Sequence, residues 1–186
     1  MEHIYFQPQF NNSFFTYPKL YTEMVLRFPS NSKFIEIGSW KGQSSAYMTV
    51  EIINSGKNIK FFCIDTWEGS EEHQEFTEVK NLYQIFKDNM KPLENYYIDI
   101  RKTSLEAAKI FDDNSIDFVF IDASHKYEDV KNDINTWLPK VKKGGILAGH
   151  DYFFQSDVWP EVRKAVDELL INIKFTNEGC WIYDVI

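Results

Sequence analysis

The sequence predicts an α/β fold built on a doubly wound sheet in which most strands run parallel. Two observations predict it. Short apolar runs recur along the chain and lead into polar or glycine-containing turns, and stretches with apolar residues at helical spacing separate the runs. Because strands that alternate with helices form right-handed βαβ crossovers, they assemble into a parallel sheet with helices on its faces.

The expected strands are short apolar runs of the kind that lie buried in parallel sheets. The runs that we assign to parallel strands are 34–37, 59–64, 96–100, 118–121 and 146–148. Residues 173–175 and 180–185 form two more runs, but only residues 176–179 separate them. That link is too short for a parallel crossover, so these two strands would pair as an antiparallel hairpin. The prediction is a Rossmann-like, mostly parallel seven-stranded sheet with a C-terminal antiparallel hairpin.

The remaining segments are helices and two additions to the core pattern. Helices are expected at 18–27, 44–54, 127–138 and 158–170. Residues 1–30 are aromatic and polar, and we expect them to cover the site or an edge of the sheet. Residues 68–92 form an insert that is either a lid or, as we favour, a surface helix. We expect residues 1–186 to form one domain, since 186 residues suit a single core.

Composition and charge exclude several function classes. The chain has 28 acidic and 20 basic residues and a net charge of -8, which disfavours attraction to nucleic acid or to a membrane surface. Cys63 and Cys180 are too few and too far apart for a disulfide framework or a zinc site. No long apolar run or basic, apolar leader is present at the start, so we expect a cytoplasmic protein that acts on a small molecule.

The segment FIEIGSWKG, residues 34–42, places an acidic residue and two glycines between a strand and a helix. Gly38 and Gly42 would let a ligand approach the backbone closely. Glu36 would repel a pyrophosphate at the helix N-terminus, which argues against a dinucleotide. A cationic ligand suits this carboxylate better, and S-adenosylmethionine carries both a sulfonium and an ammonium group. The sequence therefore favours S-adenosylmethionine as the cofactor.

Asp65 ends the next strand, where an acidic side chain typically binds ribose hydroxyls. Thr66 and Trp67 follow it and would lie beside the adenine. A lone buried tryptophan is more often part of a core, so Trp67 alone is weak support for a nucleoside site. Its combination with the glycine loop and Asp65 carries the prediction.

A second group of polar residues follows the runs at 118–121 and 146–148. Asp122, His125, His150 and Asp151 would converge at the carboxyl edge of the sheet, where open α/β sheets bind ligands. Two carboxylates with an imidazole suit Mg²⁺, or Mn²⁺, so we assign Asp122, His150 and Asp151 as metal ligands. Tyr127 and Tyr152 flank this rim, where they would either stack on a substrate ring or pack against other residues of the protein.

The stretches FIEIGSWKGQSS, CIDTW and FVFIDASHKYEDVKNDINTWLPKVKKGGILAGHDY resemble class I S-adenosylmethionine-dependent methyltransferases. IDASHKY and GGILAGHDY are similar to a metal-dependent group with macrolide-sugar O-methyltransferases and relatives of cephalosporin hydroxylase. The resemblance implies that His125 is the general base. From the loop and the resemblance together, the assigned cofactor contacts are Glu36, Gly38, Ser39, Gly42, Ser44, Asp65, Thr66, Trp67, Thr103, Ser104 and Asp122.

The predicted function is methyl transfer from S-adenosylmethionine to a hydroxyl of a small acceptor, such as a sugar or another polyol, assisted by a divalent metal. Two alternatives stay open: a methyltransferase that uses His125 without metal, and a non-catalytic module that binds the cofactor. Chelator sensitivity separates the first from the metal-assisted enzyme, and a failure to form S-adenosylhomocysteine identifies the second. The sequence leaves the oligomeric state open, with a homo-oligomer allowed.

Overall fold

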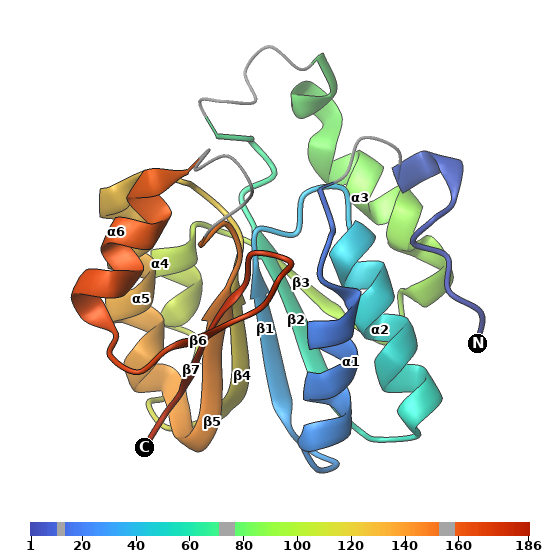
Figure 1. The fold of residues 1–186 in the computed structure, drawn as a ribbon. Helices are drawn as coiled ribbons and strands as arrows, with labels where there is room; N and C mark the ends of the chain where they lie inside the picture. Colours follow the sequence, from blue (N-terminus) through green and yellow to red (C-terminus); the bar gives the residue numbers. More distant parts are fainter. Residues whose placement is uncertain (11–13, 71–76, 153–158) are drawn as a thin grey trace.

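A computed structural model describes residues 1–10, 14–70, 77–152 and 159–186. Its centre is a seven-stranded sheet with the strand order β3-β2-β1-β4-β5-β7-β6 (Figure 1). The strands are β1 (Lys33–Ile37), β2 (Lys60–Asp65), β3 (Ile98–Arg101), β4 (Ile116–Ile121), β5 (Val141–Gly149), β6 (Lys174–Phe175) and β7 (Trp181–Asp184). The five strands β1 to β5 are all parallel to their neighbours, whereas β7 is antiparallel to both β5 and β6. The predicted mostly parallel sheet and its C-terminal hairpin are confirmed.

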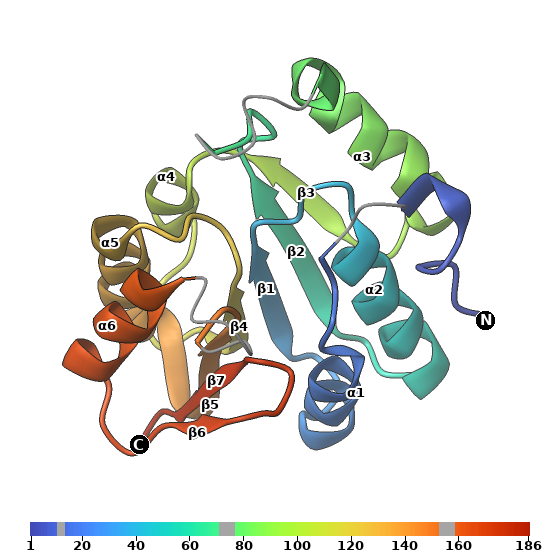
Figure 2. The same cartoon turned by 45° about the horizontal axis from the view of Figure 1, so that its top comes forward.

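Helices cover both faces of the sheet (Figures 1 and 2). One face carries α1 (Pro18–Arg27), α2 (Gln43–Ser55) and α3 (Leu82–Met90), and the other carries α4 (Ser104–Ala108), α5 (Tyr127–Trp137) and α6 (Pro160–Leu169). Short 3-10 helices lie at η1 (Pro8–Phe10), η3 (Thr77–Asn81), η4 (Lys91–Leu93) and η5 (Leu138–Lys140). Alternate residues of β4 enter opposite cores, with Phe118 and Phe120 on the α1 side and Val119 and Ile121 on the α5 side.

The structure changes the interpretation of residues 68–92. α3 is the crossover between β2 and β3, and Leu82, Phe86 and Met90 on it are fully buried against the sheet. Because these apolar residues repeat every four positions, they form the inner stripe of a core helix. The helix favoured for this segment is present at 82–90, with Gln84 and Asp88 exposed on its outer face, but it belongs to the core pattern and is not an addition to it. Residues 71–76, on which the lid interpretation also depends, lie outside the described residues.

β5 is longer than expected because Gly144 and Gly145 lie inside it. The predicted run began only after them, at residue 146, whereas the strand includes them and the register between β4 and β5 shifts near them. Gly144 has φ +79, and a Cβ on Gly145 would lie 2.9 Å from the carbonyl oxygen of Asp117. The two glycines therefore form an irregularity in a continuous strand.

The N-terminal segment packs against α2 and reaches the carboxyl edge of the sheet. The predicted helix at 18–27 is confirmed as α1, which begins with Pro18. Lys57 donates from Nζ to the carbonyl oxygens of Val25, Leu26 and Phe28 at 2.6 to 2.9 Å, which stabilises the end of this helix.

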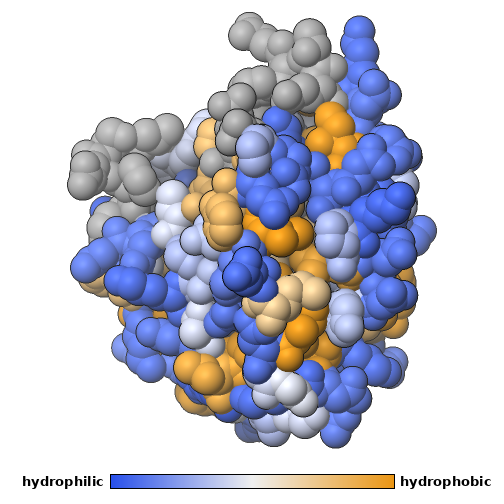
Figure 3. Space-filling view, turned by 90° about the vertical axis from the view of Figure 1, so that its right-hand side faces the viewer, coloured by the Kyte–Doolittle hydropathy of each residue, from blue (hydrophilic) through white to orange (hydrophobic). Residues whose placement is uncertain are grey.

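Figure 3, which views the right-hand side of Figure 1, shows hydrophobic residues in a band between hydrophilic ones.

Candidate active site

A cavity of about 770 Å³ opens at the carboxyl ends of the parallel strands. This is the size range of ligand sites, and the position is where open α/β sheets bind ligands. Its wall combines the loops after β1, β2, β4 and β5 with residues of the N-terminal segment. Of the assigned site residues, the wall includes Gly38, Ser39, Ser44, Asp65, Thr66, Ser104, Asp122, His125, His150 and Asp151.

The loop between β1 and α2 comes close to β4 at Gly38. A Cβ on this residue would lie 1.8 Å from the carbonyl oxygen of Asp122, and its φ is +89, so only glycine fits. Gly42 has another role. It also has φ +89, but a Cβ there would meet Met90 Cγ at 2.8 Å, and Gly42 is not in the wall formed by the described residues. Gly42 therefore allows α2 to pack on α3, and its predicted contact with the cofactor stays a prediction.

Glu36 lies beneath the loop and is almost completely buried, at 1% exposed. Its carboxylate accepts hydrogen bonds from Tyr21 Oη and Ser39 Oγ, each at 2.8 Å, and from Ser45 Oγ. Burial raises the pKa of Glu36 above its ordinary value. The described cavity wall does not include Glu36, so its direct contact with the cofactor stays a prediction. Glu36 fixes the hydroxyl of Ser39 and the loop that carries it.

Asp65 faces the cavity at the end of β2. Its Oδ2 accepts the backbone N–H of Trp40 at 2.9 Å, and its Oδ1 accepts that of Trp67 at 2.7 Å. These bonds fix the carboxylate, while burial raises its pKa. The side chain of Trp67 turns into the core, where it is 1% exposed, and Nε1 donates to the Trp40 carbonyl oxygen at 2.9 Å. The assignment of Trp67 to the adenine is therefore wrong.

The structure separates the two candidates after β3. Thr103 is the N-cap of α4, and its hydroxyl accepts the backbone N–H of Glu106 and donates to the Glu106 carboxylate. Ser104 lines the cavity and accepts a hydrogen bond from Trp137 Nε1 at 2.8 Å. Thr103 thus closes a helix terminus, and Ser104 is the residue that can meet a ligand.

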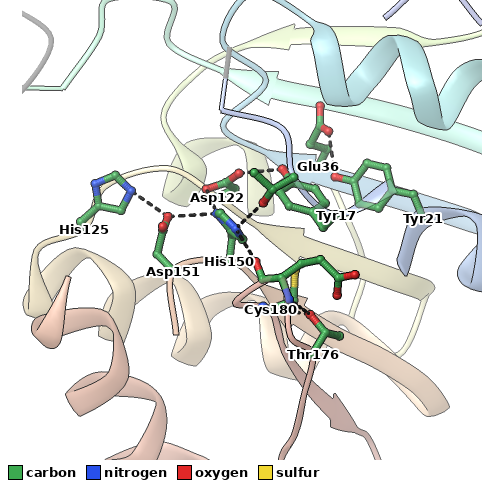
Figure 4. A network of polar contacts seen from close by, with 11 residues as sticks. Tyr17, Tyr21, Glu36, Asp122, His125, His150, Asp151, Thr176 and Cys180 are labelled. Carbon is green, nitrogen blue, oxygen red and sulfur yellow. Dashed lines mark hydrogen bonds and ion pairs between the residues drawn. The ribbon is translucent and has the colours of Figure 1, made fainter. Parts of the chain in front are cut away.

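Asp122, His125 and Asp151 converge beside this cavity, as Figure 4 shows. Each offers one donor atom, and the three atoms lie within 4.8 Å of one another. His125 Nε2 lies 3.0 Å from Asp151 Oδ2, and Tyr17 donates to Asp122 Oδ2 at 2.6 Å. Oxygen atoms of two carboxylates with one imidazole nitrogen fit a divalent cation such as Mg²⁺ or Mn²⁺.

The pKa values of the two carboxyl groups are shifted in opposite directions. Burial raises the pKa of Asp122 to about 6. Burial also disfavours the charged form of Asp151, but hydrogen bonds with His125 and His150 outweigh it and hold the pKa of Asp151 well below its usual range. Asp151 therefore stays ionised to a lower pH than Asp122, which begins to take up a proton as the pH falls toward 6.

His150 lies between the two carboxylates in Figure 4 and turns its other edge away. Nδ1 is 3.3 Å from Asp151 Oδ2, whereas Nε2 is 3.0 Å from the carbonyl oxygen of Glu178 and 3.1 Å from Thr16 Oγ1. Because a carbonyl only accepts, Nε2 carries a hydrogen. The neighbouring carboxylates outweigh burial and raise the pKa of His150 to about 9, so it neutralises them. The convergent donor group contains His125 in place of His150, which the sequence assigned as a ligand.

Aromatic residues that the sequence did not single out form part of the wall. Phe14, Phe15 and Trp159 line the cavity, and the Trp159 ring stacks on His125 with a centroid distance of 4.0 Å. Tyr127 and Tyr152, which were expected at the rim, are outside the described wall and bond to carboxylates of α6, Glu168 and Asp167. No local pattern marks Phe14 or Trp159, because only the tertiary structure brings them to the cavity that His125 and Asp122 also line.

Comparisons with known proteins give a matching family and several relatives. A family described as a methyltransferase domain matches residues 35–152. A protein of Acanthamoeba polyphaga mimivirus is 32% identical over 158 residues, which are 82% of this chain and 66% of that protein. Protein y4gI of Sinorhizobium fredii is 28% identical over 119 residues, 64% of this chain but only 13% of its own length. The chain thus spans less than two thirds of these two relatives.

Solved structures share the fold at low sequence identity. The O-methyltransferase NovP superposes with a TM-score of 0.65 at 14% identity, over 90% of this chain and 78% of its own. The TDP-rhamnose 3'-O-methyltransferase CalS11 superposes with a TM-score of 0.60 at 12% sequence identity. The match covers 90% of this chain and 76% of CalS11. An S-adenosylmethionine-dependent O-methyltransferase of Thermotoga maritima superposes with a TM-score of 0.60 at 16% sequence identity. The match covers 94% of this chain and 68% of that enzyme. In the part of the chain that the structure describes, no helix is long and apolar enough to cross a membrane.

Proposed function

Because this chain belongs to the methyltransferase domain family, whose fold it shares with S-adenosylmethionine-dependent enzymes, we propose that it methylates a hydroxyl of a small acceptor with the help of a divalent metal. The convergence of Asp122, His125 and Asp151 beside the cavity carries this proposal. The neighbours NovP and CalS11 are O-methyltransferases by name, which supports an oxygen acceptor.

The cofactor would lie along the cavity from Asp65 toward Asp122. Asp65 is fixed by two backbone N–H groups and faces the cavity, so it can accept hydrogen bonds from ribose hydroxyls. Gly38 lies in the same wall, where its loop packs on the backbone of Asp122, and Ser39 and Ser44 offer hydroxyls at the same loop. The sulfonium end would then lie near the carboxylates of Asp122 and Asp151, and their negative charge suits a cation.

His125 would accept the proton of the acceptor hydroxyl. A carboxylate only accepts hydrogen bonds, so His125 Nε2 carries the hydrogen in its 3.0 Å contact with Asp151, and Nδ1 is the nitrogen that takes a proton. Asp151 stabilises the resulting imidazolium through its charge. Trp159 fixes the plane of the ring by stacking on it. The deprotonated oxygen then takes the methyl group from the sulfonium.

Asp122 and Asp151 would hold the cation, with acceptor oxygens and water completing its coordination. When bound, a divalent cation lowers the pKa of a hydroxyl that coordinates to it. Phe14, Phe15 and Trp159 line the same cavity and would exclude water, which competes for the methyl group.

Mn²⁺ binding and turnover separate these roles. Asp122→Asn and Asp151→Asn should weaken Mn²⁺ binding, measured by calorimetry, and lower turnover of sugar diols and catechols, measured as S-adenosylhomocysteine formed. His125→Ala should keep Mn²⁺ binding and lower turnover by roughly 10² to 10⁴. His3→Ala is the matched control, because His3 packs on Tyr47 and contacts Glu51 outside the cavity wall.

Each outcome decides one role. Loss of Mn²⁺ binding in His125→Ala would make His125 a ligand and refute its assignment as the base. Full turnover by chelator-treated wild-type protein would refute metal assistance. It would favour the second candidate, a metal-independent methyltransferase that uses the pair of His125 and Asp151, which the structure holds in hydrogen-bond contact. Binding of S-adenosylmethionine without turnover of any acceptor would favour a non-catalytic module.

A further inference from the structure

We infer that Tyr17 is a positioning residue of the proposed metal site: its hydroxyl holds one oxygen of the Asp122 carboxylate so that the other is directed to the cation. The inference rests on the proposed function. It assigns a role to a residue of the N-terminal segment, which from the sequence is only a cover over the site.

The contact between the two side chains is short and shielded from water. Tyr17 Oη donates to Asp122 Oδ2 at 2.6 Å, and Tyr17 is only 2% exposed (Figure 4). A phenol is protonated at neutral pH and a carboxylate accepts, so the direction of this bond is fixed. Hydrogen bonds to charged acceptors are stronger than neutral ones, and burial strengthens them further.

The Tyr17 ring cannot easily move away from Asp122, because aromatic rings surround it. Its centroid lies 4.9 Å from that of Phe15, 4.6 Å from that of Phe120 and 4.8 Å from that of His150. These neighbours come from the N-terminal segment, from β4 and from the end of β5. The hydroxyl is therefore held in place by packing on several sides before it contacts the carboxylate.

The backbone of Asp122 is fixed as well, which leaves the carboxyl orientation as the variable that Tyr17 sets. The backbone N–H of Asp122 donates to Ile37 O at 2.8 Å, and its carbonyl oxygen lies against Gly38. Of the two carboxyl oxygens, Oδ2 is bonded by Tyr17, and Oδ1 lies 3.8 Å from His150 Nδ1. Carboxylates that bind metals are commonly oriented by such outer hydrogen bonds.

The adjacent residue, Thr16, contacts the same site independently. Its Oγ1 lies 3.1 Å from His150 Nε2, on the side of the imidazole that faces away from the carboxylates. Thr16 and Tyr17 thus touch two different residues that flank the proposed cation, and both precede α1 directly. The N-terminal segment is therefore part of the structure that orders the site.

The test compares Tyr17→Phe with Tyr21→Phe on the full chain. Tyr21 is a close match, because it is also buried, lies one helical turn away and donates one hydrogen bond, at 2.8 Å, to a buried carboxylate. That carboxylate belongs to Glu36, which is outside the described cavity wall. Calorimetric titration with Mn²⁺ alone should show about 10-fold or greater weakening in Tyr17→Phe and a change within about twofold in Tyr21→Phe. Thermal melting should show similar losses of stability for both.

A double-mutant cycle tests whether Tyr17 acts through Asp122. Adding Tyr17→Phe to Asp122→Ala should cause no further loss of Mn²⁺ affinity, since the residue it orients is gone. Equal Mn²⁺ affinity of Tyr17→Phe and wild type, or equal weakening by Tyr21→Phe, would overturn the inference. So would a full additional loss in the double variant. If wild-type protein itself fails to bind Mn²⁺, the proposed metal site fails instead, which is a separate result.

Discussion

Replacing Asp65 should weaken cofactor binding and also lower the stability of the fold, because its carboxylate serves both. The carboxylate meets the cavity and already accepts two backbone N–H groups, those of Trp40 and Trp67. Asp65→Ala removes the charged acceptor for the ribose, and a hydrogen bond to a charged group contributes about 1.5 to 3 kcal/mol. We therefore expect S-adenosylhomocysteine to bind roughly 10- to 150-fold more weakly.

Asp65→Asn is the more informative variant. Because the two oxygens accept N–H groups separately, the new NH₂ group must face either Trp40 N or Trp67 N, donor against donor. One buried N–H then loses its partner, which costs about 1 to 3 kcal/mol of folding stability. Asp65→Asn should thus lose affinity but lose less stability than Asp65→Ala, which leaves both N–H groups without their acceptor.

Asp99→Asn on the neighbouring strand β3 is the matched control. Its carboxylate bonds Lys87 Nζ at 2.7 Å and Tyr83 Oη at 2.6 Å and is not in the described cavity wall. Asp99→Asn should lower the melting temperature and leave S-adenosylhomocysteine affinity unchanged in calorimetry. Wild-type affinity in Asp65→Ala, or equal weakening in Asp99→Asn, would refute the assignment of Asp65 to the ribose.

Three further predictions concern the fold and His125. Gly38→Ala should lower the free energy of unfolding by more than about 3 kcal/mol, because its Cβ would clash with the Asp122 carbonyl. Gly144→Ala, at φ +79 with open space around it, should lower it by only about 1 to 2 kcal/mol, and urea denaturation measures both variants. Burial raises the pKa of Asp133 from 3.8 to about 7, so its stabilising contribution is complete below pH 4 and is lost as pH rises through 7. Asp133→Asn should remove a loss on the order of 4 kcal/mol from the pH profile of unfolding, and an unchanged profile would contradict this. Trp159→Ala should lower turnover by up to about 10-fold through a less ordered His125, with unchanged S-adenosylhomocysteine affinity as the check.

The sequence determined the fold class and the edge of the sheet that carries the site. Apolar runs between helical stretches predicted the parallel strands, because strand and helix periodicities are local properties. The four-residue link between the last two runs predicted the antiparallel hairpin for a similarly local reason. Asp65, Asp122 and Asp151 followed from their positions at strand ends, which the parallel topology gathers at one edge.

Side-chain direction and long-range contacts were decided by the tertiary structure. Glu36 belongs to the predicted cofactor loop and Trp67 follows Asp65, yet both turn into the core. Tyr21 and the Ser39 and Ser45 hydroxyls bind Glu36, and α3 packs on Trp67. Gly42 serves the contact between α2 and α3 for the same reason.

The contribution of the N-terminal segment to the site is the clearest example of a feature that the tertiary structure decided. Tyr17 and Asp122 are 105 positions apart, and their hydrogen bond exists only because α1 packs on α2 and brings the preceding residues over β4. A local pattern carries no signal for such a pair, since each residue alone is an ordinary tyrosine or aspartate. The composition and order of the chain thus set where chemistry would occur, and packing across the sheet set which side chains reach it.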